Sequence, residues 1–184
     1  MSKLELLVRR YEKFCALPWE RSLAGPQRVW FVVYDPVDER RLRTRLPEFG
    51  EATTNSGHKW SHVDITDDFG CWVAAQEYRD SYFECPEDID TVLPQFEQEL
   101  INKVRAALEG GDESTIVAVS GIGSLFGIIS VASLVQGVAP SIRGRMAIFF
   151  PGSFENNNYR LLDAKDGWNY LAVVITSHEG GDAQ

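Results

Sequence analysis

Cysteine and histidine are scarce in this 184-residue sequence, with three of each. Cys15, Cys71 and Cys85 are an odd number and show no C-x-x-C spacing. A small secreted domain held by disulfides has an even set of cysteines, so the sequence predicts reduced thiols and a cytoplasmic protein. A chain of this size buries roughly 70 % of its unfolded surface, so its core needs neither disulfides nor a metal.

A long uninterrupted hydrophobic run is also missing. The N-terminal residues lack the apolar core of a signal peptide. The most apolar stretch, residues 116–138, is interrupted by glycines and serines, whereas a membrane-spanning helix needs about 20 consecutive apolar residues. We therefore expect a buried core segment there and no membrane partner.

Basic residues are in the minority, because 18 lysines and arginines face 27 acidic residues and give a net charge of −9. Residues 64–113 hold 14 acidic and 3 basic side chains, while the rest of the chain holds 13 and 15. Nucleic-acid-binding domains are usually basic, so this balance argues against direct DNA binding. A segregated acidic block favours a basic protein surface as partner; solubility alone is the alternative explanation.

Hydrophobic periodicity predicts helices and strands in alternation. The expected strands span 28–34, 59–65, 115–119 and 146–150, and the expected helices span 2–16, 37–46 (ended or kinked by Pro47), 66–79 and 88–109. A turn at 120–123 is expected to lead into a last helix that runs to about residue 138. Segments 158–163 and 168–175 flank an Asp-Gly pair and predict a hairpin, and 176–184 is a polar tail. The alternation predicts a single α/β domain over 1–175, with a mainly parallel sheet of Rossmann-like or degenerate P-loop-like type flanked by helices.

Three turn signals follow expected strands: Asp35-Pro36, Ser120-Gly121 and Pro151-Gly152. In a parallel sheet these turns share one edge, and ligands of open α/β sheets bind beyond the carboxyl ends of the strands. This edge of the sheet is therefore the candidate location for a ligand site.

The glycine turn at residues 121–127 is a candidate phosphate-binding loop, because backbone N–H groups between a strand and a helix can bind anions. Its candidate ligand-binding residues are Ser120, Gly121, Gly123 and Ser124. A Walker A loop would have Lys-Ser or Lys-Thr after the last glycine, and a dinucleotide fingerprint would have a third glycine in place of a phenylalanine. Close helix–strand packing that tolerates no side chain is the alternative that we favour.

No complete catalytic or metal-binding motif is present in the sequence. Neither Ser120 nor Ser124 lies in a G-x-S-x-G pattern, and His58, His62 and His178 show no triad context. The H-x-x-x-H spacing would suit a metal on a helix, but the pattern around it predicts a turn and a strand. We therefore expect no enzymatic activity, no metal and no cofactor.

Two polar segments are candidate partner interfaces. The first holds Arg40, Arg41, Arg43 and Arg45, for which a solvated helix face is the alternative. The second is rich in asparagine, which commonly stabilises turns, and in the aromatic and arginine side chains that protein interfaces favour. Its candidate residues are Asn156, Asn157, Tyr159, Arg160, Trp168 and Tyr170.

Three stretches of the sequence carry a resemblance to a known family. They are residues 28–36 with 38–43, residues 121–127, and residues 149–152 running through 156–163 to 167–173. In these stretches the chain resembles the BrxB family of the bacterial BREX phage-defence systems. The resemblance covers nearly the whole chain and is most specific in the last stretch, whereas residues 66–113 contribute little.

The resemblance implies a small cytoplasmic component of a multiprotein antiviral system. Such systems combine a DNA methyltransferase, an alkaline-phosphatase-like protein (PglZ) and a large ATPase, and the resemblance provides no catalytic residues to carry over. It implies an accessory or scaffold subunit whose first expected partner is the PglZ-like protein, with the methyltransferase and the ATPase as further candidates. The alternative is a divergent nucleotide- or phosphate-binding regulatory protein that uses the 121–127 turn, and direct DNA contact through the arginines is a weaker third hypothesis.

Overall fold

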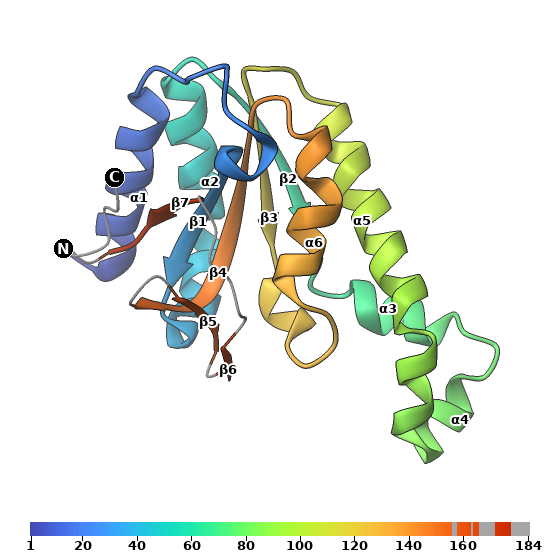
Figure 1. Cartoon of the computed structure of the whole chain (residues 1–184). Helices are drawn as coiled ribbons and strands as arrows, with labels where there is room; N and C mark the ends of the chain where they lie inside the picture. Colours follow the sequence, from blue (N-terminus) through green and yellow to red (C-terminus); the bar gives the residue numbers. More distant parts are fainter. Residues whose placement is uncertain (156–157, 163, 166–171, 178–184) are drawn as a thin grey trace.

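The structure is a computed structural model of the chain that describes residues 1–155, 158–162, 164–165 and 172–177. A central sheet lies between two layers of helices (Figure 1). Five of its strands are parallel and follow the order β2-β3-β4-β1-β7. They are β1 (Val29–Tyr34), β2 (Lys59–Asp64), β3 (Thr115–Ser120), β4 (Arg145–Glu155) and β7 (Val173–Ile175). The predicted α/β fold with a mainly parallel sheet is confirmed.

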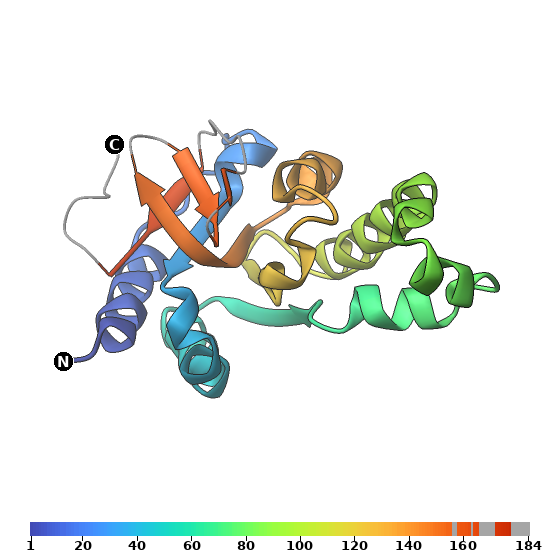
Figure 2. The ribbon, with the colours of Figure 1, turned by 90° about the horizontal axis from the view of Figure 1, so that it is seen from below.

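Helices α1 (Lys3–Ala16) and α2 (Glu39–Asn55) cover one face of the sheet (Figure 2). Ser2 begins α1 with a capping box, in which its hydroxyl accepts from the Glu5 N–H and the Glu5 carboxylate accepts from the Ser2 N–H. The Tyr11 ring meets Trp30 and Phe49 edge to face. These aromatic contacts join both helices to β1 in one hydrophobic core.

The opposite face is covered by α3 (Asp68–Ala74), α5 (Leu93–Glu109) and α6 (Val131–Val138). Helix α4 (Arg79–Glu84) lies beyond them and contributes no buried residue. Short 3-10 segments join the elements: η1 (Gly25–Arg28), η2 (Pro36–Asp38), η3 (Pro86–Thr91), η4 (Ile122–Leu125) and η5 (Ala139–Ser141). Within the described ranges, no helix is long and apolar enough to cross a membrane.

Strand β4 does not end at Pro151-Gly152 as predicted but continues to Glu155. Its second half pairs antiparallel with β5 (Asn158–Leu161), which pairs in turn with β6 (Ala164–Lys165). A C-terminal strand pair is thus confirmed, although its members differ from the predicted hairpin. Residues 173–175 instead join the main sheet parallel to β1, while 163 and 166–171 lie outside the described residues.

Helix boundaries account for the other differences from the prediction. Helix α2 runs through Pro47 to Asn55, because Phe49 and Ala52 beyond the proline are buried and their packing outweighs the missing hydrogen bond. The predicted helix over 66–79 divides into α3 and the start of α4. Helix α5 begins at Leu93, where Pro94 occupies the first turn that a proline tolerates.

The segment after β3 also differs from the expectation of a turn at 120–123 that leads directly into a helix. Gly121 adopts a left-handed φ of 86°, and the chain then forms the short η4 segment. Ser130 caps α6, so that ten residues lie between the end of β3 and the start of this helix. The glycine turn thus does not open an α-helix.

Candidate functional site

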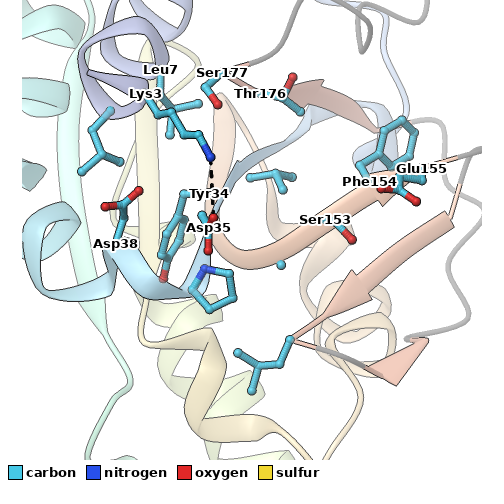
Figure 3. Close-up of a pocket in the computed structure, with 15 residues that line it drawn as sticks. Lys3, Leu7, Tyr34, Asp35, Asp38, Ser153, Phe154, Glu155, Thr176 and Ser177 are labelled. Carbon is cyan, nitrogen blue, oxygen red and sulfur yellow. Dashed lines mark ion pairs between the residues drawn. The ribbon is translucent and has the colours of Figure 1, made fainter. Parts of the chain in front are cut away.

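A cavity of about 550 Å³ opens at the carboxyl ends of β1 and β7, beside the start of α1 and the bend of β4 (Figure 3). Its volume lies within the range of small-molecule sites, about 300–1,000 Å³. Asp35 comes directly after β1 and caps η2 by accepting a 3.2 Å hydrogen bond from the Val37 N–H. The Lys3 ammonium, from the first turn of α1, lies 3.7 Å from the Asp35 carboxylate. Two of the three predicted turn signals, Asp35-Pro36 and Gly152, therefore line this cavity.

The charges around the cavity are unequal. Among the residues that the structure describes, the cavity is lined by three carboxylates, those of Asp35, Asp38 and Glu155, and by one ammonium, that of Lys3. Apolar side chains from α1, β1 and β4 complete the lining, including Leu7 and Phe154. An excess of carboxylates favours neutral or cationic groups over a phosphate, because like charges repel.

A chain of hydrogen bonds joins the carboxyl ends of β1 and β2 through α2. The Tyr34 hydroxyl donates to Glu39, and the Arg43 guanidinium donates to Glu39 (2.7 Å) and to the Thr66 hydroxyl (3.0 Å). Thr66 donates in turn to Asp64 (2.5 Å). Burial, helped by the Glu39 carboxylate, raises the pKa of Tyr34 well above its usual value. The tyrosine therefore stays a neutral donor, and the network holds this edge of the sheet together.

His62 and Ser120 form a second polar contact at the same edge. The His62 Nε2 atom lies 2.8 Å from the Ser120 hydroxyl oxygen. Partial desolvation lowers the pKa of His62 and outweighs the opposing effect of the Asp64 charge, so the imidazole favours its neutral form. The Asp64 Oδ1 atom accepts from both the N–H and the hydroxyl of Thr66. It therefore acts on His62 through its charge and, among the described contacts, does not orient the ring as a triad carboxylate does.

Sequence reasoning missed this serine–histidine pair, although strand register contains the signal. Asp64 lies opposite Ser120 and His62 lies opposite Ala118 in the β2–β3 pairing. Alternate residues of a strand share a face, so His62 and Ser120 project to the same side. The pairing of these two strands could not be read from the spacing of the residues along the chain.

The four residues of the predicted phosphate turn lie together at the end of β3, but none lines the cavity of Figure 3. A Cβ atom on Gly121 would lie 2.5 Å from the backbone nitrogen of Thr66. The Ser124 hydroxyl donates to the carbonyls of Gly121 (2.7 Å) and Ile65 (3.2 Å). Close packing against residues 65–66 thus explains the glycine at 121, and a ligand at the turn stays a prediction.

The four arginines of α2 do not form one surface. Arg43 reaches toward β2, as described above, whereas Arg45 pairs with Glu48 (2.8 Å) and lies 3.7 Å from Glu5 of α1. Arg40 and Arg41 are exposed, and Arg41 lies 3.4 Å from Asp38. A partner contact through these arginines is untested.

The C-terminal interface prediction fails at one residue. Tyr159 is 1 % exposed, and its ring packs against Phe31, Phe150 and Phe154. It is a core residue because β5 folds its ring back over the sheet. Arg160, next to it on β5, is exposed. The remaining predicted interface residues, Asn156, Asn157, Trp168 and Tyr170, lie outside the described residues.

The two histidines within the described residues, His58 and His62, make separate contacts. His58 stacks on Trp19 at 3.6 Å between ring centroids, and its Nε2 atom lies 3.1 Å from the Cys15 carbonyl oxygen. In the described part of the chain, no group of three or more histidine, cysteine or acidic side chains could hold a metal ion. His178 lies beyond that part.

A family model described as "BREX protein BrxB" matches residues 65–175, which is more than half of the chain. The matched segment includes residues 66–113, which we expected to contribute little, and it begins after the stretch at 28–43. No curated protein and no solved structure matches the chain.

Proposed function

Because this chain belongs to the BrxB family of BREX phage-defence proteins, we propose that it is a non-catalytic cytoplasmic adaptor that joins other proteins of its BREX system. The family membership carries the proposal, since membership implies association with the other BREX proteins. The PglZ-like protein is the partner that we place first, and the methyltransferase and ATPase components follow.

Charge segregation supports an adaptor. All of the net negative charge lies in residues 64–113, while the remainder of the chain is close to neutral and slightly basic. A surface of one charge steers association with a surface of the opposite charge and disfavours other partners. The two free cysteines that are exposed, Cys71 and Cys85, support a reducing compartment.

Co-purification tests the proposal directly. The tagged chain is co-expressed in turn with the PglZ-like protein, the methyltransferase and the ATPase of its own system, and captured at low and high salt. We expect a stable complex with at least the PglZ-like protein. Failure to bind any of the three would refute the adaptor function.

Calorimetry with ATP, GTP and cyclic nucleotides separates the adaptor from the alternative nucleotide-binding function. An adaptor gives no saturable heat with any of them. A saturable heat that disappears when Gly123 is replaced by a bulky residue, in a variant that remains folded, would favour the alternative.

A further inference from the structure

The region between α3 and the first turns of α5 forms an acidic lobe, defined here as residues 68–99. Both views place α4 and the N-terminal end of α5 at the extremity of the molecule opposite α1 (Figures 1 and 2). The lobe holds nine acidic side chains and one basic side chain, Arg79. Arg79 lies 3.7 Å from Asp80, and Lys103 of α5 pairs with Asp68. Most of the acidic side chains of the lobe therefore have no ion-pair partner among the described residues.

Two aromatic side chains project from this acidic surface. Tyr78 is 65 % exposed and Phe83 is 71 % exposed. No other aromatic side chain in the described ranges exceeds them, and the next most exposed is Phe126 at 45 %. A lone exposed apolar residue is ordinary, but two exposed rings five residues apart on an unburied segment resemble the aromatic anchors of protein interfaces.

The lobe also contains an apolar groove. A cavity of about 440 Å³ lies between α3 and α5, with the buried rings of Trp72 and Phe96 among its lining. Asp68 and Glu99 add carboxylates to the lining, and Lys103 adds the ammonium that Asp68 already binds. Such a groove between two helices accepts the apolar face of a third helix.

We propose that the acidic lobe is the docking surface for a basic amphipathic segment of another BREX protein, with Tyr78 and Phe83 as the anchors. This inference rests on the proposed adaptor function and assigns it a surface. Charge selects the occupant: the lobe repels nucleic acid and anionic lipid and attracts lysine- and arginine-rich protein. The remainder of this chain is nearly neutral and most of the α2 arginines already have acidic neighbours, so a second copy offers poorer complementarity.

The test compares two double variants for binding to each purified BREX protein by calorimetry. Tyr78→Ser with Phe83→Ser removes the anchors, whereas Val37→Ser with Leu17→Ser removes two apolar side chains that are also exposed but lie outside the lobe. We expect the first to weaken binding by roughly tenfold to thirtyfold, as loss of aromatic hot spots does, and the second to bind like the wild type. All four side chains are exposed, so circular dichroism should show that both variants fold.

A second pair of double variants tests the contribution of charge. Glu84→Gln with Glu87→Gln should slow association and weaken its dependence on salt concentration. Glu12→Gln with Glu51→Gln should leave the association rate and its salt dependence unchanged. All four glutamates are exposed, but only Glu84 and Glu87 lie in the lobe. If the wild type binds and the lobe variants bind equally well, the docking surface is refuted and the adaptor function stands. If the wild type binds no BREX protein, the adaptor function itself fails. Self-association that only the lobe variants abolish, in sedimentation, would assign the surface to a second copy and overturn the proposed occupant.

Discussion

Replacing Gly121 with alanine tests whether packing or ligand binding explains the glycine turn. At a φ of 86°, an L-residue costs about 1–2 kcal/mol, of which roughly 0.4–1 kcal/mol is offset by the lower entropy of the unfolded chain. The new Cβ would also lie 2.5 Å from the Thr66 backbone nitrogen, an atom that cannot move as a flexible side chain does. Overpacking of this kind adds about 1–3 kcal/mol.

The expected loss for Gly121→Ala is therefore about 1–5 kcal/mol. In a chain of this size, that loss lowers Tm by roughly 2–20 °C. Two control variants separate the contributions. Gly57→Ala has a similar φ of 84° with open space around its Cβ, so it reports the backbone cost alone. Gly123→Ala has no left-handed φ and places its Cβ 3.4 Å from Pro151, an ordinary contact, so its stability should stay within about 0.5 kcal/mol of the wild type.

Urea unfolding followed by fluorescence measures the free energy of unfolding of the three variants. Packing predicts that Gly121→Ala loses clearly more stability than Gly57→Ala. Equal losses in these two variants would refute the reasoning, because the contact with Thr66 would then carry no cost. A large loss in Gly123→Ala would refute it as well.

Two further predictions concern titratable groups. Partial desolvation holds the pKa of His62 below its ordinary value of 6.5, so the unfolded chain binds a proton more readily than the folded chain. Stability should therefore fall as pH drops below about 6.5. Thermal melts of His62→Gln over the same range should show a weaker decline than the wild type, and parallel declines would contradict the assignment. Burial also raises the pKa of the Cys15 thiol to about 11, whereas Cys71 and Cys85 are exposed. A thiol reagent should label two cysteines in the native protein and three in urea, since the thiolate is the reactive form, and rapid native labelling of all three would show that Cys15 is not buried.

The linear sequence determined the architecture, because its signals are local. Strands β1 and β3 are buried along their whole length, and a strand covered on both faces must be apolar at every position, which makes it visible as a continuous hydrophobic run. Turn residues at Asp35 and Gly121 marked the strand ends, and the sheet brought the Asp35 end to a cavity. The segregation of acidic residues is likewise visible before folding.

Tertiary structure decided the features that depend on distant contacts. Helix α2 passes through Pro47 because the burial of Phe49 offsets the loss of helix stability that the proline causes. The proline is visible in the sequence, whereas the burial of Phe49 is not. His62 meets Ser120 only because β2 and β3 are neighbours in the sheet. Tyr159, polar and next to an arginine in the sequence, is buried because β5 pairs with the continuation of β4. A linear pattern records the chemistry of each residue, whereas exposure and proximity follow from the order in which strands pair.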